Sequence, residues 1–349
     1  MRAPPALSVL LNAEYPTAKL VQLGRASEEL GYRGLWYTDL RFAHDCFVGL
    51  AAIAARTREI RLGPGVVDPY SRHPSAIASA VATLDEMTGG RAVLGLGVGG
   101  HGLKQLGIEH RLPVAAMREA VAMIRGLLGG GEYAAQGKVV SLGAAKLSVK
   151  PVQARVPIYF ATHGAQVTRL AGEVADGVLI ANTLNPTAFE FYVNQIDTGM
   201  AKANRPPGAV DVGLRVEACI AADDEAAFAV MRRRVTSRVL AQYPHWEYLD
   251  AIGLRLPEAF AEIARRPDRA RAEADAAPLM PREVVESMVL AGNAARCAEQ
   301  LARGLHPRIT HLTVRPHAVP GQDVADVIRV FAQDVVPRVH RITGMAGGG

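Results

Sequence analysis

Short apolar runs alternate with amphipathic segments along almost the whole chain. An apolar run of four to eight residues between turn residues is typical of a buried strand, whereas apolar residues repeating every three or four positions indicate a helix. The pattern predicts strands at residues 7–12, 34–39, 60–67, 91–98, 158–161, 178–181, 210–220 and 311–315. It predicts helices at residues 17–30, 47–56, 74–87, 113–128, 165–174, 186–203, 224–240, 293–305 and 323–339.

Two segments interrupt this rhythm. Residues 133–157 are polar, contain glycine and have a β-like pattern, which predicts an excursion hairpin. Residues 243–282 are charged and irregular, which predicts a helical insertion spanning about residues 241–284.

The alternation also decides between two domain organisations. A chain of 349 residues exceeds the usual single domain, so it contains either two ordinary domains or one large barrel. The expected strands are apolar along their length, as in a (β/α)8 TIM barrel, whose strands are buried on both faces. We therefore expect one α/β barrel domain over residues 1–343, followed by a disordered tail at 344–349.

Composition narrows the class of protein. Hydrophobic residues make up 49% and charged residues 21%, which excludes a disordered, collagen-like or coiled-coil chain. The three cysteines, Cys46, Cys219 and Cys297, stand too far apart for a disulfide framework or a cysteine zinc site. No signal peptide or membrane helix is complete in residues 1–14. We expect a cytoplasmic protein that is not bound to a membrane.

A net charge of +5 permits an acidic partner without requiring one. Aromatic residues are only 5% and no nucleic-acid motif accompanies the basic residues, so nucleic-acid binding is not expected. The arginines at 232–234 and 265–271 are interpreted as solvated helix faces. The positive surplus suits a polyanionic small-molecule cofactor.

The segment Gly95–Gly100 (GLGVGG) matches the G-x-G-x-x-G dinucleotide fingerprint and follows an expected strand. A Rossmann site needs a helix that begins inside the motif of the first βαβ unit. Here three strands precede the motif and the next helix waits until about Pro113. We favour a fourth barrel strand that ends in a loop close to a ligand, with a Rossmann turn as the alternative.

In a barrel the active site lies at the carboxyl ends of the strands, so the loops there hold the candidate residues. Residues 162–166 run from a strand directly into a helix, which makes either an anion site or an ordinary turn. Residues 63–69 combine one buried strand with glycines and prolines, which predicts a bulge or an irregular strand end. Asp39 and His44 are acid or base candidates, although residues of these types at such positions are more often structural than catalytic. No metal-binding or nucleophile motif is found in the sequence.

Two long segments, residues 62–100 (LGPGVVDPYSRHPSAIASAVATLDEMTGGRAVLGLGVGG) and 157–186 (PIYFATHGAQVTRLAGEVADGVLIANTLNP), carry a family resemblance. The chain resembles the luciferase-like oxidoreductase superfamily, and within it the branch that uses coenzyme F420, especially 5,10-methylenetetrahydromethanopterin reductases. This resemblance implies a barrel of the bacterial-luciferase type and a homodimer.

The resemblance assigns expected roles to residues at matching positions. It implies a non-proline cis peptide at Gly65-Val66, beside Val67, that lies against the deazaflavin. Asp39 matches an acidic residue near the ring, and Gly97 and Gly99 match the loop beside the cofactor. The cofactor phosphate is expected at the segment Thr162, His163, Gly164, Ala165 and Gln166.

For the chemistry, the expected cofactor F420 supplies a hydride, and the protein handles one proton. Asp39 is the first catalytic candidate, and Glu14, His44 and His73 are further helpers. His44 does not directly follow Asp39, where sugar-phosphate dehydrogenases of the F420 group place a catalytic histidine. The expected substrate is a small molecule with an electrophilic C=C, C=N or carbonyl group.

Two alternatives to this F420-dependent oxidoreductase stay open. One is an FMN-dependent monooxygenase of the same superfamily. The other is a barrel without redox activity that binds a ligand or a partner, because a fold alone does not establish a function.

Overall fold

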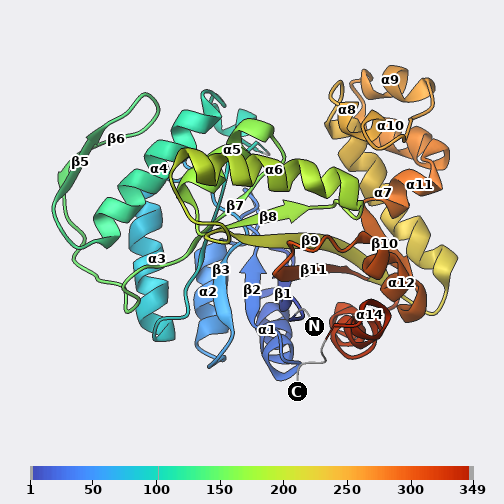
Figure 1. Cartoon of the computed structure of the whole chain (residues 1–349), viewed down its shortest axis with the longest axis horizontal. Coiled ribbons are helices and arrows are strands. Elements are labelled where there is room, and N and C mark those ends of the chain that lie inside the picture. Colours follow the sequence, from blue (N-terminus) through green and yellow to red (C-terminus); the bar gives the residue numbers. More distant parts are fainter. Residues whose placement is uncertain (1–2, 101, 346–349) are drawn as a thin grey trace. The chain divides into compact units, whose positions relative to one another are not determined.

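The computed structural model describes residues 3–100 and 102–345, which divide into two compact units. The larger unit comprises residues 6–181 and 192–213. The smaller unit comprises the described residues of 1–5, 182–191 and 214–349. Figure 1 shows the elements of both units, coloured along the chain. The single domain over residues 1–343 stays a prediction, and residues 346–349 of the expected tail lie outside the described residues.

Six strands of the larger unit are parallel and follow one another in chain order. β2 pairs with β1 and β3, and β7 pairs with β4 and β8. Two isolated parallel bridges, Leu62 with Ala92 and Val67 with Leu96, connect the β3 segment to the β4 segment. These strands are β1 (Ala6–Leu11), β2 (Gly34–Tyr37), β3 (Arg61–Pro64), β4 (Leu94–Gly97), β7 (Ile158–Ala161) and β8 (Gly177–Ala181).

Both faces of these strands are buried. On one face, Trp36 and Tyr159 pack edge to face with ring centroids 5.4 Å apart, in a cluster that includes Leu10 and Leu179. On the other face, Tyr37 packs so closely on α2 that a Cβ at Gly49 would collide with its ring. Burial on both sides is why the sequence of each strand is a continuous apolar run instead of an alternating one.

Helices follow the strands as the sequence predicts, because the local start and stop signals are strong. The Asp45 side chain caps α2 by accepting from the N–H groups of Phe47 and Val48. Pro113 occupies the first turn of α4, and Gly89, with φ of +65°, ends α3. The helices are α1 (Thr17–Glu29), α2 (Cys46–Ala54), α3 (Pro74–Thr88), α4 (Pro113–Leu128), α5 (Ala165–Val174) and α6 (Pro186–Lys202), the last with residues in both units.

The predicted excursion hairpin is confirmed. β5 (Tyr133–Gln136) and β6 (Ser141–Ala145) pair antiparallel and lie beside α4 (Figure 1). Glu119 of α4 accepts hydrogen bonds of 2.8–3.1 Å from the N–H groups of residues 138–140, which fastens the hairpin turn to the helix.

The smaller unit contains a strand that the sequence analysis missed. β10 (Val289–Gly292) pairs in parallel with the second half of β9 (Asp211–Ile220), placing Val289 beside Glu217. The last expected helix is divided into α13 (Val324–Val330), a π-helical turn η3 (Phe331–Val335) and α14 (Val336–Thr343). The other elements that frame this unit are α7 (Asp224–Ala241), α12 (Ala294–Gly304) and β11 (His311–His317).

The predicted insertion is helical and packs against α7 (Figure 1). Phe228 and Met231 of α7 share a buried core with Phe260 and Val284 of the insertion. Trp246, Leu249, Leu254 and Glu258 are among the residues that line a cavity of about 580 Å³ there. Its helices are α8 (Glu247–Asp250), α9 (Ala259–Ala264), α10 (Arg269–Ala276), η2 (Ala277–Leu279) and α11 (Arg282–Glu286).

The interpretation of residues 232–234 as a solvated helix face is partly wrong. Arg233 is exposed, but Arg232 and Arg234 are half-buried. The Arg234 Nε donates to the buried Glu217 carboxylate at 2.9 Å. Arg234 therefore binds the buried Glu217 carboxylate of β9 and is not a fully solvated residue.

Candidate active site

Two loops of the larger unit hold the carboxylates of the candidate site. Asp39 lies two residues after the end of β2, and Asp45 lies at the end of the same loop, where α2 begins. Asp68 and Arg72 lie in the loop between β3 and α3. Because β2 and β3 are parallel neighbours, the two loops leave the same edge of the sheet.

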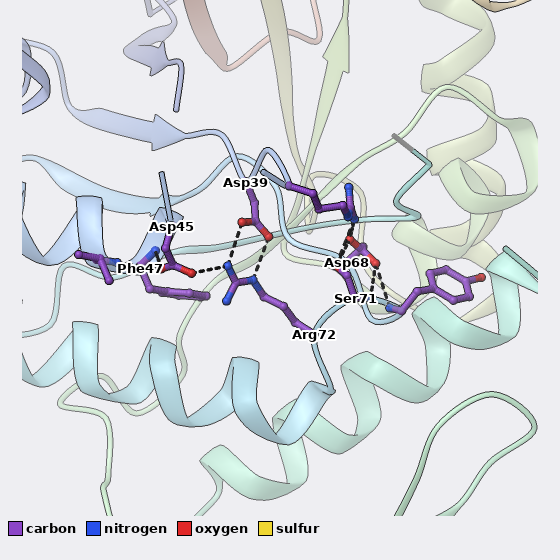
Figure 2. Close-up of polar contacts among 9 residues, drawn as sticks. Asp39, Asp45, Phe47, Asp68, Ser71 and Arg72 are labelled. Atoms are coloured by element: carbon purple, nitrogen blue, oxygen red, sulfur yellow. Dashed lines mark hydrogen bonds and ion pairs between the residues drawn. The ribbon is translucent and has the colours of Figure 1, made fainter. Parts of the chain in front are cut away.

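Arg72 joins the two loops by binding two carboxylates (Figure 2). Its Nε lies 2.9 Å from Asp39 Oδ2 and its Nη2 lies 3.0 Å from Asp39 Oδ1, a bidentate pair. The same Nη2 donates to Asp45 Oδ2 at 2.6 Å, and the guanidinium lies over the Phe47 ring, 5.6 Å from its centroid. The Asp39 side chain is only 7% exposed, and Arg72 compensates the charge of its carboxylate through this bidentate pair.

The electrostatics of this network favour its charged state. Hydrogen bonds to Asp39 raise the pKa of Arg72, although burial opposes the shift. Burial also opposes ionisation of Asp45, but Arg72 and the N–H groups of Phe47 and Val48 lower the pKa of that carboxyl below its usual value. Arg72 therefore stays cationic and Asp45 stays anionic at neutral pH.

A second carboxylate, Asp68, organises the loop after β3. Its Oδ1 accepts from the N–H groups of Tyr70 and Ser71, both at 2.9 Å, and its Oδ2 accepts from Ser71 Oγ at 2.8 Å (Figure 2). Arg41, from the loop after β2, forms an ion pair with the same carboxylate. The β3 loop thus supplies Arg72 to Asp39 of the β2 loop, and the β2 loop supplies Arg41 to Asp68 of the β3 loop. These two ion pairs hold the loops together.

The backbone after β3 is irregular, as its composition predicts. Regular strand ends at Pro64 and pairing resumes at Val67, whose N–H donates to Gly95 O at 3.1 Å. The peptide Gly65-Val66 is cis, as the resemblance implies. A Cβ at Gly97 would lie 2.6 Å from Val66 Cγ2, so only glycine allows this close approach of the two strands.

The glycine-rich end of β4 does not form a Rossmann turn. Gly99, with φ of +71°, lies in a loop that continues to a short 3₁₀ turn η1 (Lys104–Leu106), and α4 begins only at Pro113. The preferred interpretation as a strand end is therefore confirmed, and His101 lies outside the described residues.

The start of α5 is uncapped by any side chain. Gly164 is the N-cap residue with φ of −90° and ψ of 137°, and a Cβ there would meet open space. His163 and Gln166 are exposed beside it, while Thr162 is buried and its Oγ1 lies 3.3 Å from Thr168 Oγ1. The first N–H groups of the helix thus point toward an open position, where a helix favours an anion.

The model of the luciferase-like monooxygenase family matches residues 3–311 of the chain. The chain belongs to this luciferase-like family. It is 32% identical over 326 residues to 5,10-methylenetetrahydromethanopterin reductase of Methanolobus tindarius, covering 92% of this chain and 96% of that protein. It is 26% identical to F420-dependent glucose-6-phosphate dehydrogenase of Microbacterium testaceum, covering 93% and 94% of the two chains.

A solved structure of the luciferase-like family establishes the fold. The coenzyme F420-dependent tetrahydromethanopterin reductase of Methanopyrus kandleri superimposes with a TM-score of 0.86 and 27% identity, covering 97% of this chain and 100% of that one. The predicted (β/α)8 TIM barrel of the luciferase type is therefore confirmed.

The hydrogen bonds of the two histidine candidates in this luciferase-like chain go to groups other than Asp39. His44 is exposed, and its Nδ1 lies 2.7 Å from Ala13 O. His73 caps α3, with Nδ1 2.7 Å from Ser75 Oγ and Nε2 3.1 Å from Ser141 O of the hairpin. Glu14 is exposed in the turn after β1. Their roles in catalysis stay predictions.

Sequence reasoning did not assign a function to Arg72, Arg41 or Asp45. Arg72 was recognisable only as a loop residue after a strand, because its partner Asp39 is 33 residues away. Among the described residues, no group of three or more histidine, cysteine, aspartate or glutamate side chains could hold a metal ion. Within the same part of the chain, no helix is long and apolar enough to cross a membrane.

Proposed function

We propose that this protein is an F420-dependent oxidoreductase that transfers a hydride between the deazaflavin and a small organic molecule with an electrophilic C=C, C=N or carbonyl group. The observation that carries the proposal is the open N-terminus of α5, on a chain whose full-length relatives include proteins named as F420-dependent. When bound, F420 supplies the hydride.

The residues present fit such a cofactor. The N–H groups of Gly164, Ala165 and Gln166 would hold its phosphate, with Thr162 and His163 beside them, because no side chain caps this helix end. The backbone of residues 65–67 would support the flat ring together with Gly97 and Gly99. The close packing of Gly97 on Val66 would keep that support in place.

Asp39 is the carboxylate that we assign to the reacting end of the site. Both of its oxygens accept from Arg72, so its role is to hold a fixed negative charge and to accept a hydrogen bond from the reacting group. A proton would then be delivered by Glu14, His44 or His73, of which the two histidines are already held by neighbouring oxygens.

Two further properties belong to this proposal. The three cysteines are buried free thiols, which supports a reducing cytoplasmic location. We also expect a homodimer that acts on a small molecule, as the resemblance implies.

The experiment that tests the proposal is a fluorescence titration of the purified protein with F420 and, separately, with FMN. It includes Gly164→Asp, whose side chain fits the open space and would cap α5 with its own carboxylate. The matched control is Gly143→Asp, at an exposed hairpin glycine whose Cβ would also meet open space.

We expect F420 binding without FMN binding, a loss of at least about tenfold in F420 affinity for Gly164→Asp, and none for Gly143→Asp. Gly164→Asp should also unfold at a temperature no lower than the parent protein, because a cap is added. Binding of FMN alone would favour the monooxygenase alternative, and binding of neither would favour the non-redox barrel. Unchanged F420 affinity in Gly164→Asp would refute the phosphate assignment.

A further inference from the structure

Four arginines and one histidine surround a single buried carboxylate in the smaller unit. Arg215 and Glu217 are two residues apart on β9, so their side chains leave the same face of that strand. Arg315 and His317 have the same relation on β11. Arg234 and Arg238 are four residues apart on α7, which places them on one face of the helix.

Glu217 is the common partner of this arginine cluster. Its Oε2 accepts from Arg234 Nε at 2.9 Å and from His317 Nε2 at 2.8 Å. Its Oε1 accepts from Arg238 and lies 3.6 Å from Arg315 Nη1. The Glu217 side chain is 1% exposed, so these contacts replace its hydration almost completely.

The charges in the arginine cluster do not balance. His317 is neutral, because burial lowers its pKa to about 4 in spite of its bond to Glu217. Even without Arg315, three guanidiniums against one carboxylate leave an excess of two positive charges. Burial lowers the pKa of Arg215 to about 9, Glu217 opposes that shift, and the other three arginines add to it. Arg215 is thus still cationic at neutral pH.

Arg215 is the member of the cluster with spare hydrogen-bonding capacity. Its carbonyl accepts from the Asn182 N–H at 2.9 Å, but its guanidinium forms no hydrogen bond or ion pair with any residue that the structure describes. A guanidinium carries five donors in a planar fork that suits two oxygens of a carboxylate or phosphate. Concentrated positive charge that is partly removed from water is unfavourable unless an anion offsets it.

Solvent reaches the cluster, so an anion can enter it. The side chains of Arg234, Arg238 and Arg315 are 38%, 24% and 15% exposed, and Arg215 is half-buried. His317 is the last residue of β11, and Glu217 lies near the carboxyl end of β9. Barrels of this class bind their substrates at the carboxyl ends of their strands.

We propose that Arg215, with Arg234, Arg238 and Arg315, binds a small oxyanion, a phosphate or a carboxylate. Glu217 holds the arginines in place and limits the positive charge when the anion is absent.

The first test measures anion binding to the full protein without F420, by isothermal titration calorimetry and thermal unfolding. Inorganic phosphate and succinate are the two probes, and the tighter one identifies the anionic group. Arg215→Gln should weaken binding of that anion at least about tenfold, because it removes a charged donor pair. The control Arg329→Gln, at a side chain 49% exposed on α13, should leave binding unchanged. Absence of binding of both anions to the parent protein would overturn the proposal.

Glu217→Gln provides a second test that does not depend on Arg215→Gln folding. Glutamine is neutral and keeps only one of the two acceptor oxygens, so the variant raises the excess from two to three positive charges and frees some of the donors that bound the carboxylate. The anion should therefore bind more tightly and raise the unfolding temperature of Glu217→Gln more than that of the parent protein. A purely structural network predicts a destabilised variant that the anion does not restore, and that result would refute the site.

The F420 titration separates this inference from the proposed function. F420 affinity should be the same in Arg215→Gln and in the parent protein. A parallel loss of F420 affinity would assign the arginine cluster to the cofactor and overturn its assignment to a separate anion. If the parent protein fails to bind F420 but its anion binding depends on Arg215, the proposed function fails while the anion site stands.

Discussion

The pair of Asp39 and Arg72 offers the sharpest test of the candidate site. Arg72→Gln removes both hydrogen bonds to a carboxylate whose side chain is 7% exposed. It also removes the single bond to Asp45, whose side chain is 42% exposed. The interactions of Arg72 with Asp39 and with Asp45, called here its Asp39 arm and its Asp45 arm, therefore differ mainly in exposure. Water can hydrate the Asp45 carboxylate after Arg72 is removed more easily than it can hydrate Asp39.

The expected cost follows from that difference in burial. Removing one partner of a fully buried ion pair costs about 3–5 kcal/mol. Water reaches the Arg72 side chain, which is 30% exposed, so we expect a loss of about 2–3 kcal/mol for the Asp39 arm. The more exposed Asp45 arm should contribute less than about 1 kcal/mol.

The assay is urea unfolding of Arg72→Gln, Asp39→Asn, the double variant and Asp45→Asn. The control Asp45→Asn loses the charge of the exposed arm but keeps a residue that caps α2, because asparagine is also a good N-cap. The double-mutant cycle of Asp39 and Arg72 should show a coupling of about 2 kcal/mol. If Arg72→Gln costs no more than Asp45→Asn, or the coupling is below about 0.5 kcal/mol, the argument from burial is wrong.

Two further predictions concern packing and pH. Gly97→Ala places a Cβ 2.6 Å from Val66 Cγ2, so it should lower the free energy of unfolding by about 1–3 kcal/mol and weaken F420 binding. The control Gly143→Ala should change neither, and urea unfolding and fluorescence titration measure the two effects. Unchanged F420 binding in Gly97→Ala would remove Val66 from the proposed cofactor contact. His317 has a folded pKa of about 4, below its usual 6.5, so the stability that it confers is complete above pH 6.5 and declines as the pH falls toward 4. Between pH 7 and pH 5 the parent protein should lose about 2 kcal/mol that His317→Gln does not lose, and parallel pH profiles would contradict this account.

Local signals were sufficient for most elements. Glycine and proline limit or extend the conformations of their own backbone, so they indicate where a helix begins or ends. The helices α4 and α5 accordingly have the predicted bounds Pro113–Leu128 and Ala165–Val174. β10 was missed because the apolar run of its four residues, Val289–Gly292, is short and comes soon after the irregular insertion. Their strand character comes from pairing with the long β9, which lies about seventy residues earlier in the chain.

The pattern of apolar and polar residues along the chain did not predict interactions between side chains that are distant in sequence. Asp39 and Arg72 were each recognisable as loop residues at strand ends, but not as a pair. The arginines of α7 had the spacing of a solvated face, and the structure places Arg234 and Arg238 on a buried carboxylate. Charge alone does not indicate whether a side chain turns to water or to a partner, because that depends on what packs beside it.

The sequence by itself determined the order of strands and helices, the barrel class and the segments from which a site could be built. The physical reason is that burial of apolar strands and the conformational limits of glycine and proline operate within a few residues. Only the tertiary structure decided that Arg72 joins two loops through Asp39, that α5 begins without a cap, and that Arg234, Arg238 and Arg315 converge on Glu217. Those contacts arise when segments tens of residues apart pack together, where the energy of a charge depends on its neighbours and its access to water.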